Sequence, residues 1–166
     1  MTRALPLWAA LVMLPTVASP CRAEEPEALQ ASPPGCISAQ SSASDKQAAA
    51  GHVLAQMMGP VAGAAPMPAT PVMHFAPDLF PLAQQNIFGN LWARCGLSRH
   101  DRSLVTLGIL IALRADNELR YHFPIAMRNG VSRSELEEVV YQATGYAGFP
   151  AGASAARIAD ETLPKP

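Results

Sequence analysis

Large apolar residues return at every third or fourth position through much of the second half of the chain. The pattern runs through residues 78–93 and resumes over residues 99–114. This is the spacing of a helix with one buried face, whereas no segment shows the strict alternation of a half-buried strand. Because residues 99–114 are apolar nearly all round, we expect a central buried helix or the core helix of an oligomer. The sequence therefore predicts a compact all-α domain from about residue 75 to residue 163.

Start and stop signals divide this domain into helices. Ser132 and Glu135 form a capping box, in which each side chain accepts a hydrogen bond from the backbone N–H of the other. Ser98 with Asp101 is a similar start, with Asp where Glu is usual. Pro150 suits the first turn of a last helix. The stop signals are Gly96, Asn129-Gly130, and Gly145 or Gly148.

The chain begins with the pattern of a secretory signal peptide. Arg3 is followed by an apolar segment from Leu5 to Ala18, which is too short to cross a bilayer comfortably. Cys21-Arg22-Ala23 then resembles a small-residue cleavage site. We therefore interpret residues 1–23 as a signal peptide and expect a periplasmic or secreted protein. The alternatives are a lipoprotein modified at Cys21 and an uncleaved membrane anchor, and both are disfavoured by the prolines in this segment.

Residues 24–77 are expected to form a partly disordered extension. Residues 24–45 are rich in proline, serine, alanine and glutamate and hold almost no large apolar side chains. Burial there cannot offset the entropy cost of ordering the chain. Residues 46–58 can form a short helix with Asp45 as its N-cap. The prolines of residues 60–77 predict an irregular segment that wraps the domain or covers a pocket.

Charge and hydropathy exclude two classes of partner. Cleavage of the signal removes Arg3 and Arg22 and leaves 10 basic against 13 acidic residues, a net charge of about −3. The sequence has no basic patch or lysine-rich run, so we expect no nucleic-acid partner. No second apolar segment is long and unbroken enough to span a bilayer, so we expect no membrane association after cleavage.

Two of the three cysteines, Cys36 and Cys95, lie beyond the predicted signal peptide. In an oxidising compartment they can pair and tie the extension to the domain. The alternative is that Cys95 is a small buried apolar residue and Cys36 lies in a mobile tail. No other cysteine or histidine stands at ligand spacing, so we expect no metal site and no cofactor.

The strongest candidate for chemistry is the pair Glu118 and His122. Four residues apart on a predicted helix, they lie on one face within reach of each other. His122 also lies on an apolar stripe with Leu119, Phe123 and Ala126, so it should point inward. A carboxylate beside an inward-facing imidazole is a simple general acid/base pair. The structural alternative is a buried histidine satisfied by Glu118 without a catalytic role.

Pro124 interrupts the pattern of the same helix. It has no backbone N–H and disturbs the carbonyl group of Arg120. We expect the helix either to bend or to break and restart there. We interpret this residue as a tolerated bend at a surface turn rather than as part of the chemistry.

Five motifs in this region carry a family resemblance. They are Trp92–Ser98, Asp101–Thr106, Glu118–His122, Arg128–Val131 and Tyr146–Ala151. In their order and spacing, over roughly residues 78–163, they resemble the carboxymuconolactone decarboxylase family. The resemblance implies an all-α domain of the alkylhydroperoxidase D-like type, usually assembled as a homotrimer or a homohexamer.

The redox branch of that family does not fit this chain. That branch uses a Cys-x-x-Cys-x-x-x-His motif with a glutamate upstream. Anchored on His122, the motif would need cysteines at Ala115 and Glu118 and the glutamate at Ser103. A hydroperoxide-detoxifying activity with a resolving cysteine pair is therefore disfavoured, although Cys95 could act as a lone peroxidatic thiol.

The decarboxylase branch keeps a glutamate and a histidine, as this chain does at Glu118 and His122. It acts on a carboxylated lactone from aromatic breakdown, so the resemblance implies a small anionic organic substrate. Arg102 or Arg120 could hold a carboxylate by a two-pronged contact. His122 could donate or shuttle a proton, tuned by Glu118. One departure is Cys95, where the family commonly has proline, and another is the predicted export.

Two hypotheses from different classes follow. The first is an exported, cofactor-independent decarboxylase or related lyase acting on a small carboxylated lactone or ring acid. It predicts a pocket lined by Glu118, His122 and an arginine. The second is a non-catalytic oligomeric protein that kept the fold and binds a small molecule.

Overall fold

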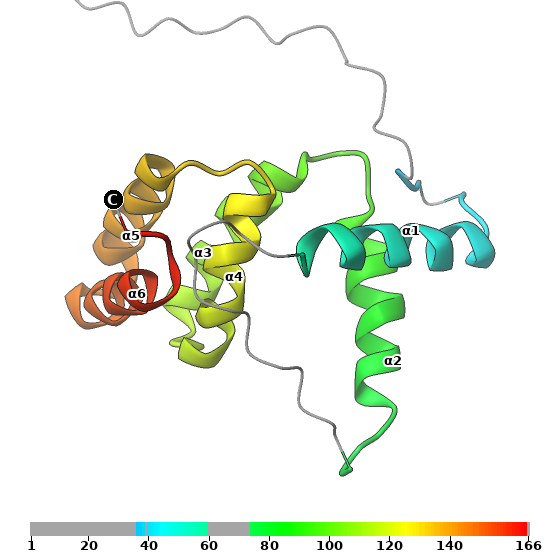
Figure 1. Cartoon of the computed structure of the whole chain (residues 1–166), viewed down its shortest axis with the longest axis horizontal. Helices are drawn as coiled ribbons and strands as arrows, with labels where there is room; N and C mark the ends of the chain where they lie inside the picture. The colour runs from blue at the N-terminus through cyan, green and yellow to red at the C-terminus, as the bar shows by residue number, and fades with distance from the viewer. Residues whose placement is uncertain (1–35, 39, 60–73, 166) are drawn as a thin grey trace, which may run out of the picture. The chain divides into compact units, whose positions relative to one another are not determined.

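The computed structural model describes residues 36–38, 40–59 and 74–165, and its regular structure is helical (Figure 1). The predicted signal peptide lies outside the described residues. The elements are α1 (Ala43–Met57), α2 (Leu79–Ala83), the π-helix η1 (Gln84–Trp92), α3 (Arg99–Ala112), α4 (Asp116–Arg128), α5 (Arg133–Ala147) and α6 (Phe149–Thr162). The prediction of an all-α fold is confirmed. None of the described helices is long and apolar enough to cross a membrane.

Helices α3 to α6 enclose the main apolar core. α3 packs against α4 and α5, and α6 packs against the same two helices (Figure 1). The stripe expected to point inward on α4 does so, and burial of each large side chain contributes roughly 1.5–3 kcal/mol. The principal core residues are Leu107 and Ile111 of α3, Leu119, Phe123 and Ala126 of α4, Leu136 and Val140 of α5, and Ala155 and Ile158 of α6.

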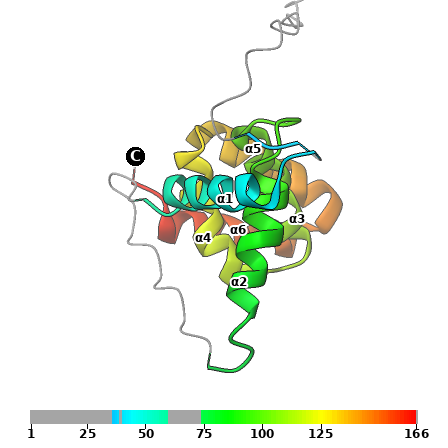
Figure 2. The ribbon, with the colours of Figure 1, turned by 90° about the vertical axis from the view of Figure 1, so that its right-hand side faces the viewer.

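A second apolar cluster joins α1 and η1 to another face of α4. Its buried members are Ile37, Ala49, Val53, Met57, Trp92, Ala93 and Ile125. α1 crosses η1 (Figure 2) so closely that a Cβ added at Gly89 would lie 3.0 Å from the Lys46 backbone oxygen. A residue without a side chain permits this approach. α4 therefore has buried residues on two of its faces.

The described part of the N-terminal extension is more ordered than its composition suggests. Ile37 is buried, and Cys36 forms a disulfide with Cys95, with the two Cα atoms 5.3 Å apart. The prediction that Asp45 caps the short helix is wrong. Ser42 is the N-cap, and Asp45 completes a capping box with it.

The helix predicted at residues 78–93 is a composite. The short α2 continues directly into η1, whose wider turn cannot be distinguished from an α-helix by apolar spacing over nine residues. No residue of α2 is buried, and its N-terminal end extends away from the other helices (Figures 1 and 2). The exposed apolar side chains of α2 and η1 are Leu79, Phe80, Leu82, Ile87 and Leu91.

The α3 helix is buried on one side only. Val105, Ile109 and Leu113 are 54%, 53% and 71% exposed. The expectation of a helix buried all round is therefore wrong for the single chain, because no described segment covers this outer face. Its apolar character leaves the alternative of an oligomer-core helix.

The predicted boundary signals around α4 and α5 act largely as expected. α4 continues through Pro124 as one helix, so of the two expected alternatives the break does not occur. Pro124 is buried, so the expectation of a surface turn is wrong. The capping box of α5 is confirmed. The Ser132 N–H donates to Glu135 Oε2 at 2.7 Å, and the Glu135 N–H donates to Ser132 Oγ at 3.3 Å. Gly148, with φ of +87°, separates α5 from α6.

A buried glycine at the contact between α5 and α6 tests this packing. A Cβ at Gly152 would lie 1.9 Å from Thr144 Oγ1 and 3.1 Å from Thr144 Cβ. Thr144 Oγ1 also donates to the Val140 carbonyl oxygen at 2.7 Å, so the hydroxyl cannot turn away without losing that bond. We expect Gly152→Ala to lower the free energy of unfolding by about 1–3 kcal/mol, measured by urea titration.

Gly145→Ala on α5 is the matched control, because no atom lies within 4 Å of its added Cβ. It should be neutral or slightly stabilising, as alanine is in helices. Thr144→Ala should recover part of the loss when combined with Gly152→Ala. Equal losses in the two glycine variants would contradict the packing described.

Candidate active site

His122 faces η1, where its ring stacks on that of Trp92. The two ring centroids are 6.3 Å apart and the ring planes are inclined by 23°. Trp92 is 7% exposed and belongs to the cluster shared by α1, η1 and α4. The contact between Trp92 and His122 joins two separate helices and could not be inferred from the spacing of residues along the sequence.

Burial lowers the pKa of His122 to about 4. The protonated ring is penalised because the water that would solvate its charge is excluded. Burial is the sole cause of the shift, so no charged neighbour contributes to it. At neutral pH the imidazole is therefore uncharged, and it can accept a proton or orient a substrate oxygen through its N–H.

Glu118 lies one helical turn before His122 on α4, and its side chain is exposed. Among the residues that the structure describes, no hydrogen bond or ion pair joins the two side chains, and Glu118 plays no part in the pKa of His122. The alternative of a buried, internally satisfied pair does not describe this arrangement. The acid/base role of Glu118 and His122 stays a prediction.

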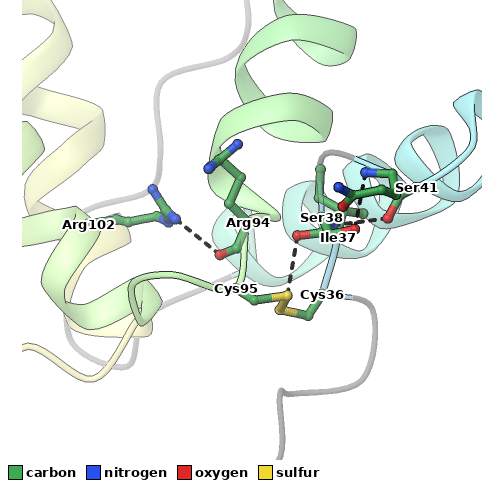
Figure 3. The surroundings of a disulfide bond; sticks show 8 residues. Cys36, Ile37, Ser38, Ser41, Arg94, Cys95 and Arg102 are labelled. Atoms are coloured by element: carbon green, nitrogen blue, oxygen red, sulfur yellow. Dashed lines mark hydrogen bonds between the residues drawn. A yellow bond between two sulfur atoms is a disulfide. The ribbon is translucent and has the colours of Figure 1, made fainter.

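Arg102, one of the two arginines predicted to hold a carboxylate, has no carboxylate partner among the described residues. Its Nη2 donates to the Arg94 carbonyl oxygen at 3.1 Å, which ties α3 to the segment that follows Trp92 (Figure 3). Its Nε is buried and has no hydrogen-bond partner in the described part of the chain. A buried unpaired donor costs free energy, and a carboxylate oxygen would satisfy it.

Arg120 already has a carboxylate partner. Its Nη1 lies 2.5 Å from Glu161 Oε2 on α6, and Glu161 also pairs with Arg157 at 2.7 Å. This pairing holds Arg120 on the α6 side of α4, whereas His122 faces η1. The structure therefore does not bring Arg120 together with His122.

Arg128, which the sequence gives no reason to single out beyond its place in a family motif, also has unpaired donors. Its Nη1 donates to the Met57 carbonyl oxygen at the end of α1. Its Nε and Nη2 are buried without partners among the described residues. Arg128 thus links α1 to α4, a contact between segments too far apart in sequence for spacing to reveal.

His100, unlike His122, lies between two carboxylates. Its Nδ1 lies 3.0 Å from Asp101 Oδ1, and its Nε2 lies 3.1 Å from Glu135 Oε1. The hydrogen bond to Asp101 is the largest cause that raises the pKa of His100, and Glu135 adds to it. Because Glu135 lies in the first turn of α5, we interpret this cluster as a clamp between α3 and α5.

An open groove of about 480 Å³ lies between α3 and α5. None of the four predicted site residues lines it, so it is not the pocket expected around Glu118, His122 and an arginine. Its lining is mainly apolar, with Leu104, Gly108, Ala112, Val139, Ala143 and Tyr146 beside Glu135 and Glu138.

Neither Ser103 nor Cys95 is available for the redox chemistry considered above. Ser103, at the place of the upstream glutamate, is buried; its Oγ donates to the Arg99 carbonyl oxygen at 2.9 Å and accepts from Asn129 Nδ2 at 3.0 Å. The thiol of Cys95 is consumed by the disulfide with Cys36. Cys95 is therefore not a free peroxidatic thiol in this structure.

Comparison with known proteins points to a single family. Residues 77–161 match the model of the carboxymuconolactone decarboxylase family. Over 76 residues the chain is 45% identical to 4-carboxymuconolactone decarboxylase of Acinetobacter baylyi, covering 46% of this chain and 57% of that protein. It is 40% identical over 76 residues to nitrosuccinic acid decarboxylase of Metarhizium robertsii, covering 46% of this chain and 53% of that protein. The matched region thus spans little more than half the length of these relatives.

The buried imidazole should make the protein sensitive to mild acid. A histidine in the unfolded chain titrates near 6.5, whereas the pKa of His122 is about 4 in the folded protein. Between these values the unfolded state binds more protons, so stability rises with pH. Lowering the pH from 7 to 5 should therefore remove about 2 kcal/mol from the free energy of unfolding through His122, measured by urea titration.

His122→Gln should lose this acid sensitivity. His100→Gln is the matched control and should keep it, because the pKa of His100 is raised and its contribution to stability is lost as pH rises instead. Equal acid sensitivity in the wild type and in His122→Gln would contradict the buried, uncharged state of His122.

Proposed function

Because the chain belongs to the carboxymuconolactone decarboxylase family, we propose that it is a cofactor-independent carboxy-lyase acting on a small carboxylated lactone or related ring acid. The observation that carries the proposal is the uncharged His122 beneath Trp92, inside the region that matches the family. Both relatives above are named as decarboxylases, which supports the reaction class.

The reaction requires a site that binds the carboxylate, surrounds it with an apolar surface and delivers a proton to carbon. The bond between the carboxylate carbon and the neighbouring carbon breaks, CO2 leaves, and the electron pair stays on the neighbouring carbon until a proton fills the position. An apolar surface favours the loss of carboxylate charge, because water no longer stabilises the charged starting state. Trp92 and the surrounding cluster supply such a surface beside His122.

His122 is the proposed proton carrier. In the free protein its low pKa keeps it uncharged. A bound substrate anion would raise that pKa, because a nearby negative charge favours the imidazolium. His122 would then take up a proton and deliver it to carbon as CO2 leaves. Glu118, exposed one turn earlier on α4, is the proposed partner that passes His122 a proton from solvent.

Arg102 is the proposed carboxylate clamp. The buried Nε without a partner supports this role, since an anion would satisfy a donor that the described residues leave unpaired. Arg120, which the family resemblance offers as an alternative, is engaged by Glu161. It would have to give up that partner to bind substrate.

We also propose that the protein is exported. The disulfide between Cys36 and Cys95 supports this location, because such bonds persist in oxidising compartments such as the periplasm. The first 23 residues, with their basic start and apolar run, support a cleaved signal peptide.

A homo-oligomer is the proposed working state. The outer face of α3, with Val105, Ile109 and Leu113, is exposed in the single chain. The apolar groove between α3 and α5 lies beside it. Apolar surface of this kind on a single chain indicates a protein interface.

The proposed reaction predicts CO2 release from small carboxylated lactones or β-keto acids by the purified full chain, measured by a coupled bicarbonate assay. His122→Gln should lower kcat by about 10²–10⁴-fold, the usual contribution of a positioned acid or base. Arg102→Lys should mainly raise KM, because lysine keeps the charge but not the planar fork.

His100→Gln is the matched control, since His100 lies in a separate cluster and should leave CO2 release unchanged. Circular dichroism and light scattering should show that each variant is folded and assembled. Thermal stabilisation by these acids without turnover would favour the binding-protein hypothesis, and release that survives His122→Gln would remove His122 from the mechanism.

If the protein is a homo-oligomer as proposed, Ile109→Glu should dissociate it. A carboxylate at the centre of the outer face of α3 would be buried without a partner on association. Size-exclusion chromatography with light scattering should show a multimer for the wild type and a monomer for this variant. Met58→Glu, at an exposed apolar residue after α1, is the control and should stay assembled. A monomeric wild type would contradict the proposal.

A further inference from the structure

The start of the extension is fastened to the segment that follows η1. We call the described residues from Cys36 to Met57 the N-terminal strap. Its first residue forms the disulfide with Cys95 (Figure 3). Beside this bond the Ile37 N–H donates to the Ala93 carbonyl oxygen at 2.8 Å, and the Cys95 N–H donates to the Ile37 carbonyl oxygen at 3.4 Å. The strap therefore holds the backbone immediately after Trp92.

The rest of the strap is fixed to the same region. In its middle, α1 meets η1 at Gly89, whose added Cβ would lie 3.0 Å from the Lys46 backbone oxygen and 3.5 Å from Ala50 Cβ. At its end, the Met57 carbonyl oxygen accepts a hydrogen bond from Arg128 of α4. The strap thus connects η1 to the helix that carries His122.

The side chains of the strap complete the burial of Trp92. Ile37, Val53 and Met57 belong to the apolar cluster that contains Trp92, and each is at most 4% exposed. Trp92 in turn stacks on His122. Removing the strap would open one side of Trp92 to water and give it freedom to move off the imidazole.

We propose that the disulfide-tied strap is a positioning element of the active site, which holds Trp92 against His122 and so sets the environment in which His122 reacts. The proposal rests on the proposed decarboxylase function of His122. The strap ends before residue 77, where the region that matches the family begins. The reacting residues therefore lie within the family region, whereas the segment that positions them lies outside it.

Charged neighbours do not explain the state of His122. Its lowered pKa has burial as its sole cause. Loss of the cover should therefore move the pKa toward 6.5 with no opposing ion pair to hold it down. The charged or titratable groups on α4 and on elements packed against it include Glu118, Arg120 and Arg128 of α4, Arg102 of α3, Glu161 of α6 and His52 of α1.

The test follows the imidazole itself in the full chain. Proton NMR titration of histidine ring signals, assigned by the signal lost in His122→Gln, reports the pKa of His122 without requiring turnover. In the double variant Cys36→Ser/Cys95→Ser, we expect this pKa to rise by at least one unit from about 4. The limb of the pH profile of kcat/KM for CO2 release that reports His122 should move in the same direction.

A second route loosens the strap without touching a cysteine. Gly89→Ala places a methyl group against the Lys46 backbone oxygen and should raise the pKa of His122 in the same direction. Gly51→Ala on α1 is the matched control, because no atom lies within 4 Å of its added Cβ, and it should leave the pKa unchanged. Trp92→Leu should raise the pKa, whereas Trp92→Phe, which keeps an aromatic ring over the imidazole, should hold it near the wild-type value.

A pKa of His122 that stays near 4 in both the double cysteine variant and Gly89→Ala would overturn the proposal. A wild-type value near 6.5 would overturn it as well. If the pKa shifts as expected while no acid releases CO2, the strap proposal stands and the decarboxylase function fails. If His122-dependent CO2 release occurs with no shift in the strap variants, the function stands and the strap proposal fails.

Discussion

The burial of α4 on two faces is the constraint on which the rest of this structure depends. Leu119 and Phe123 point into the core formed with α3, α5 and α6, whereas Ile125 points into the cluster formed with α1 and η1. His122 is adjacent in sequence to a core residue and stacks on Trp92 of the second cluster. The imidazole is half-buried between these contacts, and the desolvation that results keeps it uncharged near neutral pH. A helix with one buried face would leave the same side chain close to its ordinary pKa.

Most of the domain could be predicted from the sequence, because the responsible signals are local. Apolar spacing marks the buried stripe of α4, and the Ser132–Glu135 capping box marks the start of α5. The errors arise where the determining contact is remote. The composition before residue 46 predicts a tail, but Ile37 finds a buried place against Ala93, which only the folded chain brings near it. Periodicity could not decide between a central buried helix and an oligomer-core helix for α3, because it counts apolar residues and not the surfaces available to cover them.

The candidate site was predictable only in its central residue. His122 stands out because it is a titratable group on an apolar stripe, and its burial follows from that position. Its environment depends on Trp92, and the roles of the arginines depend on partners in other helices. Arg120 is paired with Glu161, whereas Arg102 keeps a buried donor without a partner among the described residues. The two arginines thus differ in whether they are free to bind a substrate carboxylate. This difference depends on contacts between helices, which the spacing of residues along the sequence does not reveal.

The residues that match the family and the residues that bury them come from different parts of the chain. The matched region contains His122, Trp92 and Arg102, the residues on which the proposed chemistry depends. The surface that buries Trp92 comes in part from Ile37 and Met57, which precede that region. The acidity of a buried histidine depends on how completely its surroundings exclude water, so a few side chains outside the matched region can alter reactivity while every matched residue stays the same. Relatives that share the helices but bury this tryptophan differently would then differ in the pH range over which His122 can transfer a proton, even if they catalyse the same type of reaction.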